Sequence, residues 1–184
     1  TMAINLLAPF FLTYLLLDTL EKSPAARVVT VSSESYRQGG KPDYNDIELQ
    51  KSYTFTKAYG LSKRYVIWVM RHFGEETKKR GIANVNVTFN LCEPGSTKTD
   101  LARVSEKNFF FNLLLHLWKP MEWSIAKAAA TSIYLATSNE MKGITGKFYG
   151  NCKEKTMKPK LFPKEGEQII WDYCMKACLP YKEE

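Results

Sequence analysis

Residues 27–33, Arg-Val-Val-Thr-Val-Ser-Ser, decide the fold class of this chain. A short β-branched run without alternation of apolar and polar positions is typical of a strand buried on both faces of a parallel sheet. The apolar segment before it, 5–20, predicts a buried helix that ends at the turn signal of residues 22–24. The polar stretch after it, 34–57, predicts a long connection, and connections of that length in compact domains are usually functional.

Further segments continue this alternation of helix and strand. They are a helical apolar face over 59–80, an alternating strand over 85–91, a helix over 123–135, a strand between glycines over 146–150 and an amphipathic helix over 165–179. This order predicts an α/β fold with a parallel sheet, whose ligand crevice lies beyond the carboxyl ends of the strands. No internal repeat or domain boundary interrupts the pattern, so we expect a single domain over 1–184.

The composition is that of an ordinary globular protein. Of the 184 residues, 45% are hydrophobic and 24% are charged, which excludes disordered, collagen-like and low-complexity classes. The 26 Lys and Arg outnumber the 19 Asp and Glu and give a net charge of +7. The lysines gather loosely over 147–164 without arginine-rich runs or a nucleic-acid motif, so we expect a solvated basic face and no nucleic-acid partner.

The four cysteines are too few and too irregularly spaced for a disulfide scaffold, which favours a reducing compartment such as the cytoplasm. Cys174 and Cys178 would share one helix face, but neither of the two histidines accompanies them, so we expect no metal site.

The amino-terminal stretch, 2–17, is largely apolar. It is shorter than about 18 residues, contains Asn5, Pro9 and Thr13, and has no basic region, so neither a signal peptide nor a membrane-spanning helix is expected. The apolar pattern begins at Thr1 with no preceding turn or cap, as expected of a chain cut from a longer one.

A phenol and an ammonium stand four residues apart at Tyr59 and Lys63, so both would lie on one face of a helix. A cation beside a phenol favours its ionised form, which suits proton exchange with an alcohol or a carbonyl. Tyr53 and Lys57 have the same spacing, so spacing alone does not choose between the pairs. Tyr59 opens the long predicted helix, which favours the pair of Tyr59 and Lys63.

Short motifs in a fixed order add a family resemblance to this pattern. They are Asn5 in the first predicted helix, Val-Thr-Val-Ser-Ser at 29–33, Asp-Tyr-Asn-Asp at 43–46, Lys-Ala-Tyr-Gly-Leu-Ser-Lys at 57–63, Pro-Gly-Ser-Thr-Lys-Thr at 94–99 and Gly-Lys-Phe-Tyr at 146–149. With these motifs the chain resembles the short-chain dehydrogenase/reductase family, and within it the retinol-dehydrogenase-like branch. The resemblance implies a Rossmann-like parallel sheet with flanking helices and an NAD(P)-dependent oxidoreductase activity.

The resemblance also implies roles for individual residues. Tyr59 would be the general acid/base, and Lys63 would lower its pKa and hold the nicotinamide ribose hydroxyls. Ser33 would hydrogen-bond the substrate oxygen, and Asn5 would hold its helix and a water of the proton relay. The alternatives are a packed aromatic at Tyr59, a turn-capping Ser33 with Ser32 as the competing donor, and a buried Asn5 bonded to backbone.

The cofactor implied by the resemblance is NAD or NADP, with NADP favoured. Pro94, Gly95 and Thr99 would line the nicotinamide, and Thr99 would contact its carboxamide. The family's variable substrate-covering segment would fall at about 101–123, where residues 109–118 are strongly apolar. This apolar run suits a small lipophilic alcohol or carbonyl compound such as a retinoid, a steroid or an aldehyde, or a peripheral contact with an intracellular membrane, and a plain core helix is the alternative.

The sequence departs from the family pattern at its start. The 184 residues contain neither the Thr-Gly-x-x-x-Gly-x-Gly turn that approaches a cofactor pyrophosphate nor the Asn-Asn-Ala-Gly motif. We therefore expect the carboxyl-terminal part of an incomplete Rossmann-like fold, with an unpaired sheet edge and negligible activity of the chain alone. A non-catalytic remnant that acts as an interaction or membrane-associated protein is the alternative function.

Overall fold

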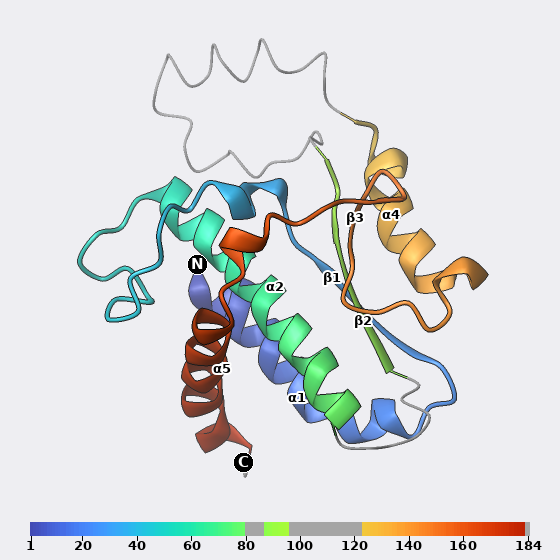
Figure 1. Cartoon of the computed structure of the whole chain (residues 1–184), viewed down its shortest axis with the longest axis horizontal. Helices are drawn as coiled ribbons and strands as arrows, with labels where there is room; N and C mark the ends of the chain where they lie inside the picture. Colours follow the sequence, from blue (N-terminus) through green and yellow to red (C-terminus); the bar gives the residue numbers. More distant parts are fainter. Residues whose placement is uncertain (80–86, 96–122, 183–184) are drawn as a thin grey trace.

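The computed structural model describes residues 1–79, 87–95 and 123–182, and this part is built on a four-stranded sheet (Figure 1). The strands are β1 (Ala26–Val31), β2 (Val87–Glu93), β3 (Phe148–Gly150) and β4 (Lys153–Glu154), in the order β1-β2-β3-β4. β1, β2 and β3 are parallel, and β4 returns antiparallel to β3. The predicted α/β fold with a parallel sheet is therefore confirmed.

Helices cover both faces of this sheet (Figure 1). One π-helical turn (Ala3–Leu7) leads into α1 (Ala8–Glu21), which packs with α2 (Phe55–Lys79) on one face. α5 (Lys164–Cys178) packs against α1 and α2, and α4 (Ile125–Thr137) covers the opposite face. α4 and α5 match their predicted ranges to within two residues at each end. The apolar segment 109–118 and the substrate-covering segment 101–123 lie outside the described residues, except for Trp123.

α2 begins four residues earlier than predicted. Thr54 caps it, because its hydroxyl oxygen accepts a hydrogen bond from the Lys57 amide at 3.2 Å and its carbonyl accepts one from the Ala58 amide at 2.9 Å. The prediction that Tyr59 opens the helix is therefore wrong, and Tyr59 lies in the second turn.

The two long strands differ in burial. All seven residues of β2 are buried, because β2 lies between β1 and β3 and contacts both α2 and α4. In β1 only Ala26 is buried and Val31 is 48% exposed, so the prediction of burial on both faces is wrong. β1 is an edge strand of the described sheet, with β2 as its partner there.

The first helix is buried on one face only, whereas the sequence predicted a buried helix. Leu6, Phe10 and Leu17 face the core, while an opposite apolar stripe is exposed, which consists of Ile4, Leu12, Leu15 and Leu16. Among the described residues, the helical stretch from Ala3 to Glu21 is the one long and apolar enough to cross a membrane by length and composition. In this structure its inner face packs into the core.

An aromatic cluster joins the helices to the sheet. The ring of Phe73 in α2 lies 5.3 Å from that of Phe10 in α1, 5.9 Å from that of Phe89 in β2 and 4.7 Å from that of Trp171 in α5, measured between centroids. Aromatic pairs at these separations stabilise a core beyond their buried area. The cluster fixes α2 relative to the strands, and so determines where the side chains of α2 meet the sheet.

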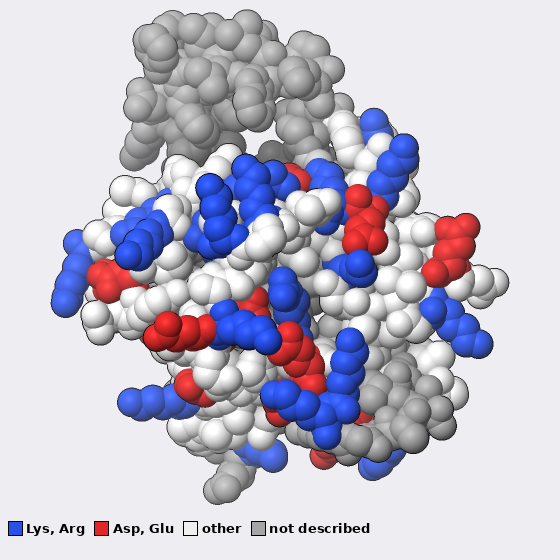
Figure 2. Space-filling view, in the orientation of Figure 1, with Lys and Arg blue, Asp and Glu red and all other residues white. Residues whose placement is uncertain are grey.

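Basic side chains are spread unevenly over the surface. Figure 2 shows a gathering of Lys and Arg over the 3-10 turn Glu34–Arg37 (η2), the loop that follows it and the 3-10 turn Pro159–Leu161 (η6). The predicted basic run over 147–164 therefore shares a surface with residues that follow β1.

Candidate active site

The carboxyl ends of β1, β2 and β3 lie level with one another. Val31 pairs with Cys92, and Glu93 pairs with Gly150. Two hydrogen bonds connect this edge to α2, since Lys63 Nζ donates to the Val31 carbonyl at 3.2 Å and Ser32 Oγ donates to the Lys63 carbonyl at 2.8 Å. Lys63 therefore lies at the end of the sheet where ligands of open α/β folds bind.

Tyr59 and Lys63 contact each other as their spacing predicted. The Lys63 ammonium lies 5.8 Å from the centroid of the Tyr59 ring, within the range of a cation–π contact, and Phe55 stacks on the same ring at 6.0 Å. Burial lowers the pKa of Lys63. Because a desolvated ammonium is less strongly hydrated, its electrostatic influence on nearby groups is larger than in water.

The competing tyrosine lies elsewhere. Tyr53 precedes α2, so it cannot share a helical face with Lys57, and its side chain is 60% exposed. The Lys57 ammonium instead donates to Ser52 Oγ at 2.9 Å. Only Tyr59 and Lys63, of these two pairs, lie together at the end of β1.

Asn5 contacts the same turn of α2. Its Nδ2 donates to Ser62 Oγ at 3.1 Å, and Ser62 Oγ donates to the Tyr59 carbonyl at 2.9 Å. The partner of Asn5 is thus a side-chain hydroxyl, rather than the backbone group considered as its alternative. This chain of two hydrogen bonds ties the π-helical start of the first helix to the turn that carries Tyr59.

The two serines after β1 have different surroundings. Ser32 is 2% exposed, and its hydroxyl hydrogen is used by the Lys63 carbonyl. Ser33 is partly exposed and caps η2, with its Oγ accepting from the Ser35 amide at 3.2 Å. Capping uses a lone pair and leaves the hydroxyl hydrogen available, so Ser33 can both cap the turn and donate to a ligand.

The turn after β2 depends on a glycine. Gly95 has φ +75°, and a Cβ there would lie 2.7 Å from the indole ring of Trp123. Its amide donates to Glu93 Oε2 at 2.6 Å, which holds Pro94 and Gly95 against the end of β2. Thr99, the third predicted nicotinamide contact, lies outside the described residues.

Sequence reasoning missed an ionic cluster at this edge. Lys155 Nζ bridges Glu34 Oε1 at 2.8 Å and Glu93 Oε1 at 2.7 Å. A Cβ on Gly150 would collide with the Glu93 carboxylate, so Gly150 provides the space for the cluster. Burial lowers the pKa of Lys155, but the hydrogen bonds and charges of the two carboxylates raise it by more, and the net pKa lies above the ordinary value. The available signal was Glu93 itself, because a carboxylate at the end of a buried strand needs a partner.

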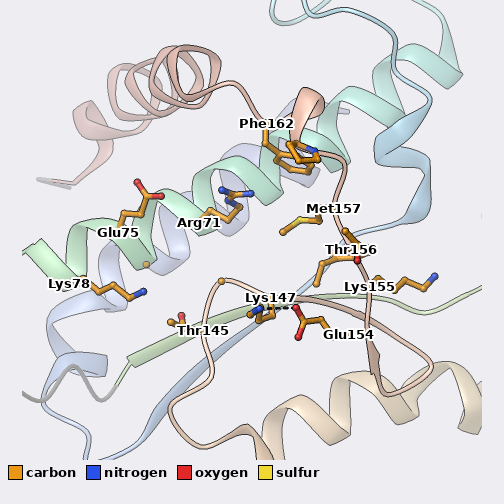
Figure 3. Close-up of a pocket in the computed structure, with 14 residues that line it drawn as sticks. Arg71, Glu75, Lys78, Thr145, Lys147, Glu154, Lys155, Thr156, Met157 and Phe162 are labelled. Atoms are coloured by element: carbon orange, nitrogen blue, oxygen red, sulfur yellow. Dashed lines mark hydrogen bonds and ion pairs between the residues drawn. The ribbon is translucent and has the colours of Figure 1, made fainter.

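A hollow of the described structure lies along the carboxyl-terminal half of α2, and Lys155 of the ionic cluster is part of its lining (Figure 3). It has a volume of about 480 Å³ and lies between α2, around Arg71 and Lys78, and the segment from Lys147 to Met157. Figure 3 shows Lys147 paired with Glu154 across from the side chains of α2, and that pair is 2.8 Å apart. Arg71 is about 18 Å along α2 from Tyr59 at the rise of an α-helix, so this hollow is separate from the pair of Tyr59 and Lys63.

Within the described residues, no three His, Cys, Asp or Glu side chains form a group that could hold a metal ion. Burial raises the pKa of Cys174, and both Cys174 and Cys178 are buried free thiols.

The sequence model of the short-chain dehydrogenase family matches residues 1–108 of this chain. This range includes Asn5, Ser33, Tyr59, Lys63 and the Pro94-Gly95 turn. The chain belongs to the short-chain dehydrogenase family. This confirms the resemblance carried by the motifs, and it makes the chain an oxidoreductase by family.

Relatives of this short-chain dehydrogenase include Retinol dehydrogenase 14 of Homo sapiens, with 34% identity over 173 residues that cover 92% of this chain and 49% of the relative. Retinol dehydrogenase 12 of Mus musculus is 30% identical over 169 residues, covering 92% and 51%. The WW domain-containing oxidoreductase of Pongo abelii is 30% identical over 178 residues, covering 93% and 41%. The chain thus spans about half the length of the curated relatives it matches, or less.

Solved structures show the same fold. An uncharacterized protein from Mycobacterium paratuberculosis superposes with a TM-score of 0.64 at 19% identity, over 96% of this chain and 57% of its own. A protein from Pseudomonas syringae described as a short chain dehydrogenase superposes with a TM-score of 0.57 at 24% identity, over 82% and 50%. The four-stranded sheet therefore corresponds to part of a larger Rossmann-like fold.

Proposed function

We propose that this chain carries the proton-transfer part of an NAD(P)-dependent oxidoreductase that interconverts an alcohol and a carbonyl. One observation carries the proposal: the Lys63 ammonium lies over the ring of Tyr59 while it donates to the last carbonyl of β1. A phenol and a cation are thereby held at the sheet end where this family's fold binds ligands.

In the proposed mechanism the Tyr59 hydroxyl exchanges a proton with the substrate oxygen. The positive charge of Lys63 stabilises the phenol oxygen as its proton leaves, and the Ser33 hydroxyl donates a hydrogen bond to the substrate oxygen. Asn5 acts through Ser62 to hold the turn of α2 that carries Tyr59. The nicotinamide, when bound, supplies or accepts the hydride.

The donor groups at this edge fit the nicotinamide end of such a cofactor. The ammonium of Lys63 would hold the ribose hydroxyls, and Pro94, Gly95 and Thr99 would line the nicotinamide. NADP is the favoured dinucleotide. The 184 residues contain no glycine-rich turn for the pyrophosphate, so we infer that this chain alone turns over substrate at a negligible rate and that activity needs a polypeptide with that turn.

The proposed substrate is a small lipophilic alcohol or carbonyl compound, such as a retinoid, a steroid or an aldehyde. Two observations support this proposal. Two relatives are named retinol dehydrogenases, and the segment 101–123, which is proposed to cover the substrate, contains an apolar run. We place the protein in the cytoplasm with a peripheral contact to an intracellular membrane, for which the exposed stripe of Leu12, Leu15 and Leu16 is suited.

That stripe also favours a second function. A non-catalytic relative that keeps this part of the fold would use the apolar face of α1 to bind a partner or a membrane. The arrangement of Asn5, Ser62 and Tyr59 is better explained by catalysis, because a binding surface on the far face of α1 does not require it.

The test restores the glycine-rich half. A fusion of the amino-terminal half of human Retinol dehydrogenase 14 to this chain is assayed for NADPH oxidation with an aldehyde substrate. We expect turnover by the fusion and none by the chain alone. Tyr59→Phe should lower kcat by about 100-fold or more, since general acid/base groups contribute that much.

Tyr53→Phe is the matched control, because it removes the exposed phenol that precedes α2 and leaves α2 intact. Equal loss of kcat in both variants, or substantial turnover by the chain alone, would contradict the proposed function.

A further inference from the structure

A second hollow of the described structure is lined by cations without carboxylates. It has a volume of about 410 Å³, and the side chains of five basic residues contribute to it, namely Arg37, Lys41, Arg64, Lys158 and Lys160. Gly40, Pro42 and Leu161 complete the lining. The loop after β1 and the turn η6, which are far apart in the sequence, meet here in the basic surface of Figure 2.

Arg64 is the innermost of these cations. It is only 2% exposed, whereas the other four are exposed. Its Nε donates to the Tyr36 carbonyl at 2.8 Å and its Nη1 donates to the Gly40 carbonyl at 2.7 Å. Its Nη2 is buried without a hydrogen-bond partner among the residues that the structure describes.

The charge of Arg64 lacks a counter-ion within the described part of the chain. No ion pair with a carboxylate is formed by this guanidinium there, and its two acceptors are neutral carbonyls. A buried guanidinium remains protonated, and a buried charge without an opposite charge is costly. Burial lowers the pKa of Arg64, as expected of a cation held away from water.

The rim adds exposed positive charge. Lys41, Lys158 and Lys160 are exposed, and within the described ranges the structure shows no hydrogen bond or ion pair for their ammonium groups. Arg37 pairs with Glu34 at 2.8 Å, and Glu34 also contacts Lys155, so one carboxylate there is shared by two cations. The lining thus concentrates uncompensated positive charge around one concave volume.

We propose that this hollow binds a phosphate group carried by a larger molecule. A phosphate offers several acceptor oxygens and up to two negative charges, which match the planar donors of Arg64 and the rim lysines. The volume leaves room for an organic compound or a lipid headgroup that carries the phosphate. The site is independent of the proposed oxidoreductase function, because none of its residues belongs to the Tyr59–Lys63 site.

Phosphate binding would also stabilise the loop after β1. Arg64 already holds this loop through the carbonyls of Tyr36 and Gly40. An anion beside Arg64 would offset the cost of its buried charge and strengthen the position of both carbonyls. A ligand that binds the folded state and not the unfolded state raises Tm by mass action. The rise in Tm therefore measures phosphate binding without any enzymatic activity.

The experiment titrates the 184-residue chain with inorganic phosphate by isothermal titration calorimetry, at constant ionic strength with chloride as the replaced anion. A triple variant, Lys41→Ala with Lys158→Ala and Lys160→Ala, should weaken binding by about tenfold or more, because the loss of even one charge-assisted contact has that magnitude. Arg64→Met should abolish the rise in Tm that phosphate causes, and circular dichroism checks its fold.

The matched control removes three exposed lysines outside the hollow, Lys22, Lys142 and Lys176, and so makes the same change in net charge. It should bind phosphate like the natural chain. Vesicle sedimentation then identifies the source of the phosphate. Vesicles of phosphatidylcholine with phosphatidic acid are compared with vesicles of equal charge that contain phosphatidylserine. Preferential sedimentation with phosphatidic acid indicates a lipid headgroup, and binding of inorganic phosphate without vesicle binding indicates a soluble compound.

Equal losses in both triple variants would show general charge attraction and would overturn the proposal. Failure of the natural chain to bind either inorganic phosphate or phosphatidic acid vesicles would overturn it as well.

Discussion

Replacing Lys155 by Ala tests the ionic cluster at the ends of the strands. The change removes the ammonium that contacts Glu93 Oε1 at 2.7 Å and leaves a carboxylate that is 5% exposed with the Gly95 amide as its described donor. Removing one partner of a fully buried pair costs roughly 3–5 kcal/mol. The Lys155 side chain is 34% exposed, so water screens part of this, and we expect a loss of about 2 kcal/mol in the free energy of unfolding.

For a chain of this size that loss lowers Tm by about 4–8 °C. Thermal unfolding followed by circular dichroism measures it, with Lys153→Ala as the control, because Lys153 is an exposed neighbour in β4. The double variant with Glu93→Gln should be more stable than Lys155→Ala alone, since no unpaired buried charge remains.

The pH dependence has a defined sign. The pKa of Lys155 is raised in the folded chain, so its stabilisation is complete below the ordinary lysine pKa of about 10.4 and is lost as the pH rises through the folded-state value. The difference in Tm between the natural chain and Lys155→Ala should therefore shrink as the pH rises through that alkaline window. Equal Tm values for Lys155→Ala and Lys153→Ala at neutral pH would refute the reasoning.

Three further predictions concern the stability of the fold and the reactivity of its cysteines. Gly60→Ala should destabilise the fold by more than about 2 kcal/mol in urea denaturation, because its Cβ would lie 2.6 Å from a backbone nitrogen of the loop after β1. Gly74→Ala is the control, and it should be neutral or stabilising because the nearest atoms to its Cβ would lie at 3.7 Å. Thr54→Ala should cost about 1 kcal/mol in the same assay, because it removes the cap of α2, and an unchanged midpoint would contradict the assigned cap. Burial raises the pKa of Cys92 to about 11, so iodoacetamide at pH 8 should label the partly exposed Cys152 and spare Cys92, as mass spectrometry of peptides can show.

The order of helices and strands could be predicted because each element has its own periodicity. The boundaries do not follow from periodicity alone. The apolar face of α2 starts at Tyr59, but Thr54 supplies a cap one turn earlier, and the cap lies outside the apolar pattern. The exposure of Val31 could not be read from the β-branched run, because it depends on whether another strand pairs with β1.

The candidate site was predicted in part. The contact between Tyr59 and Lys63 follows from helical spacing, and the choice between Ser32 and Ser33 required burial, since both follow the same strand. The bridge from Lys155 to Glu93 joins residues 62 positions apart and depends on the space left by Gly150. No local pattern contains such a pairing.

The aromatic cluster also constrains how the chain folds during synthesis. The ring of Trp171 lies 5.1 Å from that of Phe10 and 4.7 Å from that of Phe73, so residues near opposite ends of the chain complete one another's packing. On the ribosome, α1 and α2 emerge long before α5 does. Both phenylalanine rings therefore lack this partner until α5 has been synthesised, and up to that point they leave apolar surface exposed.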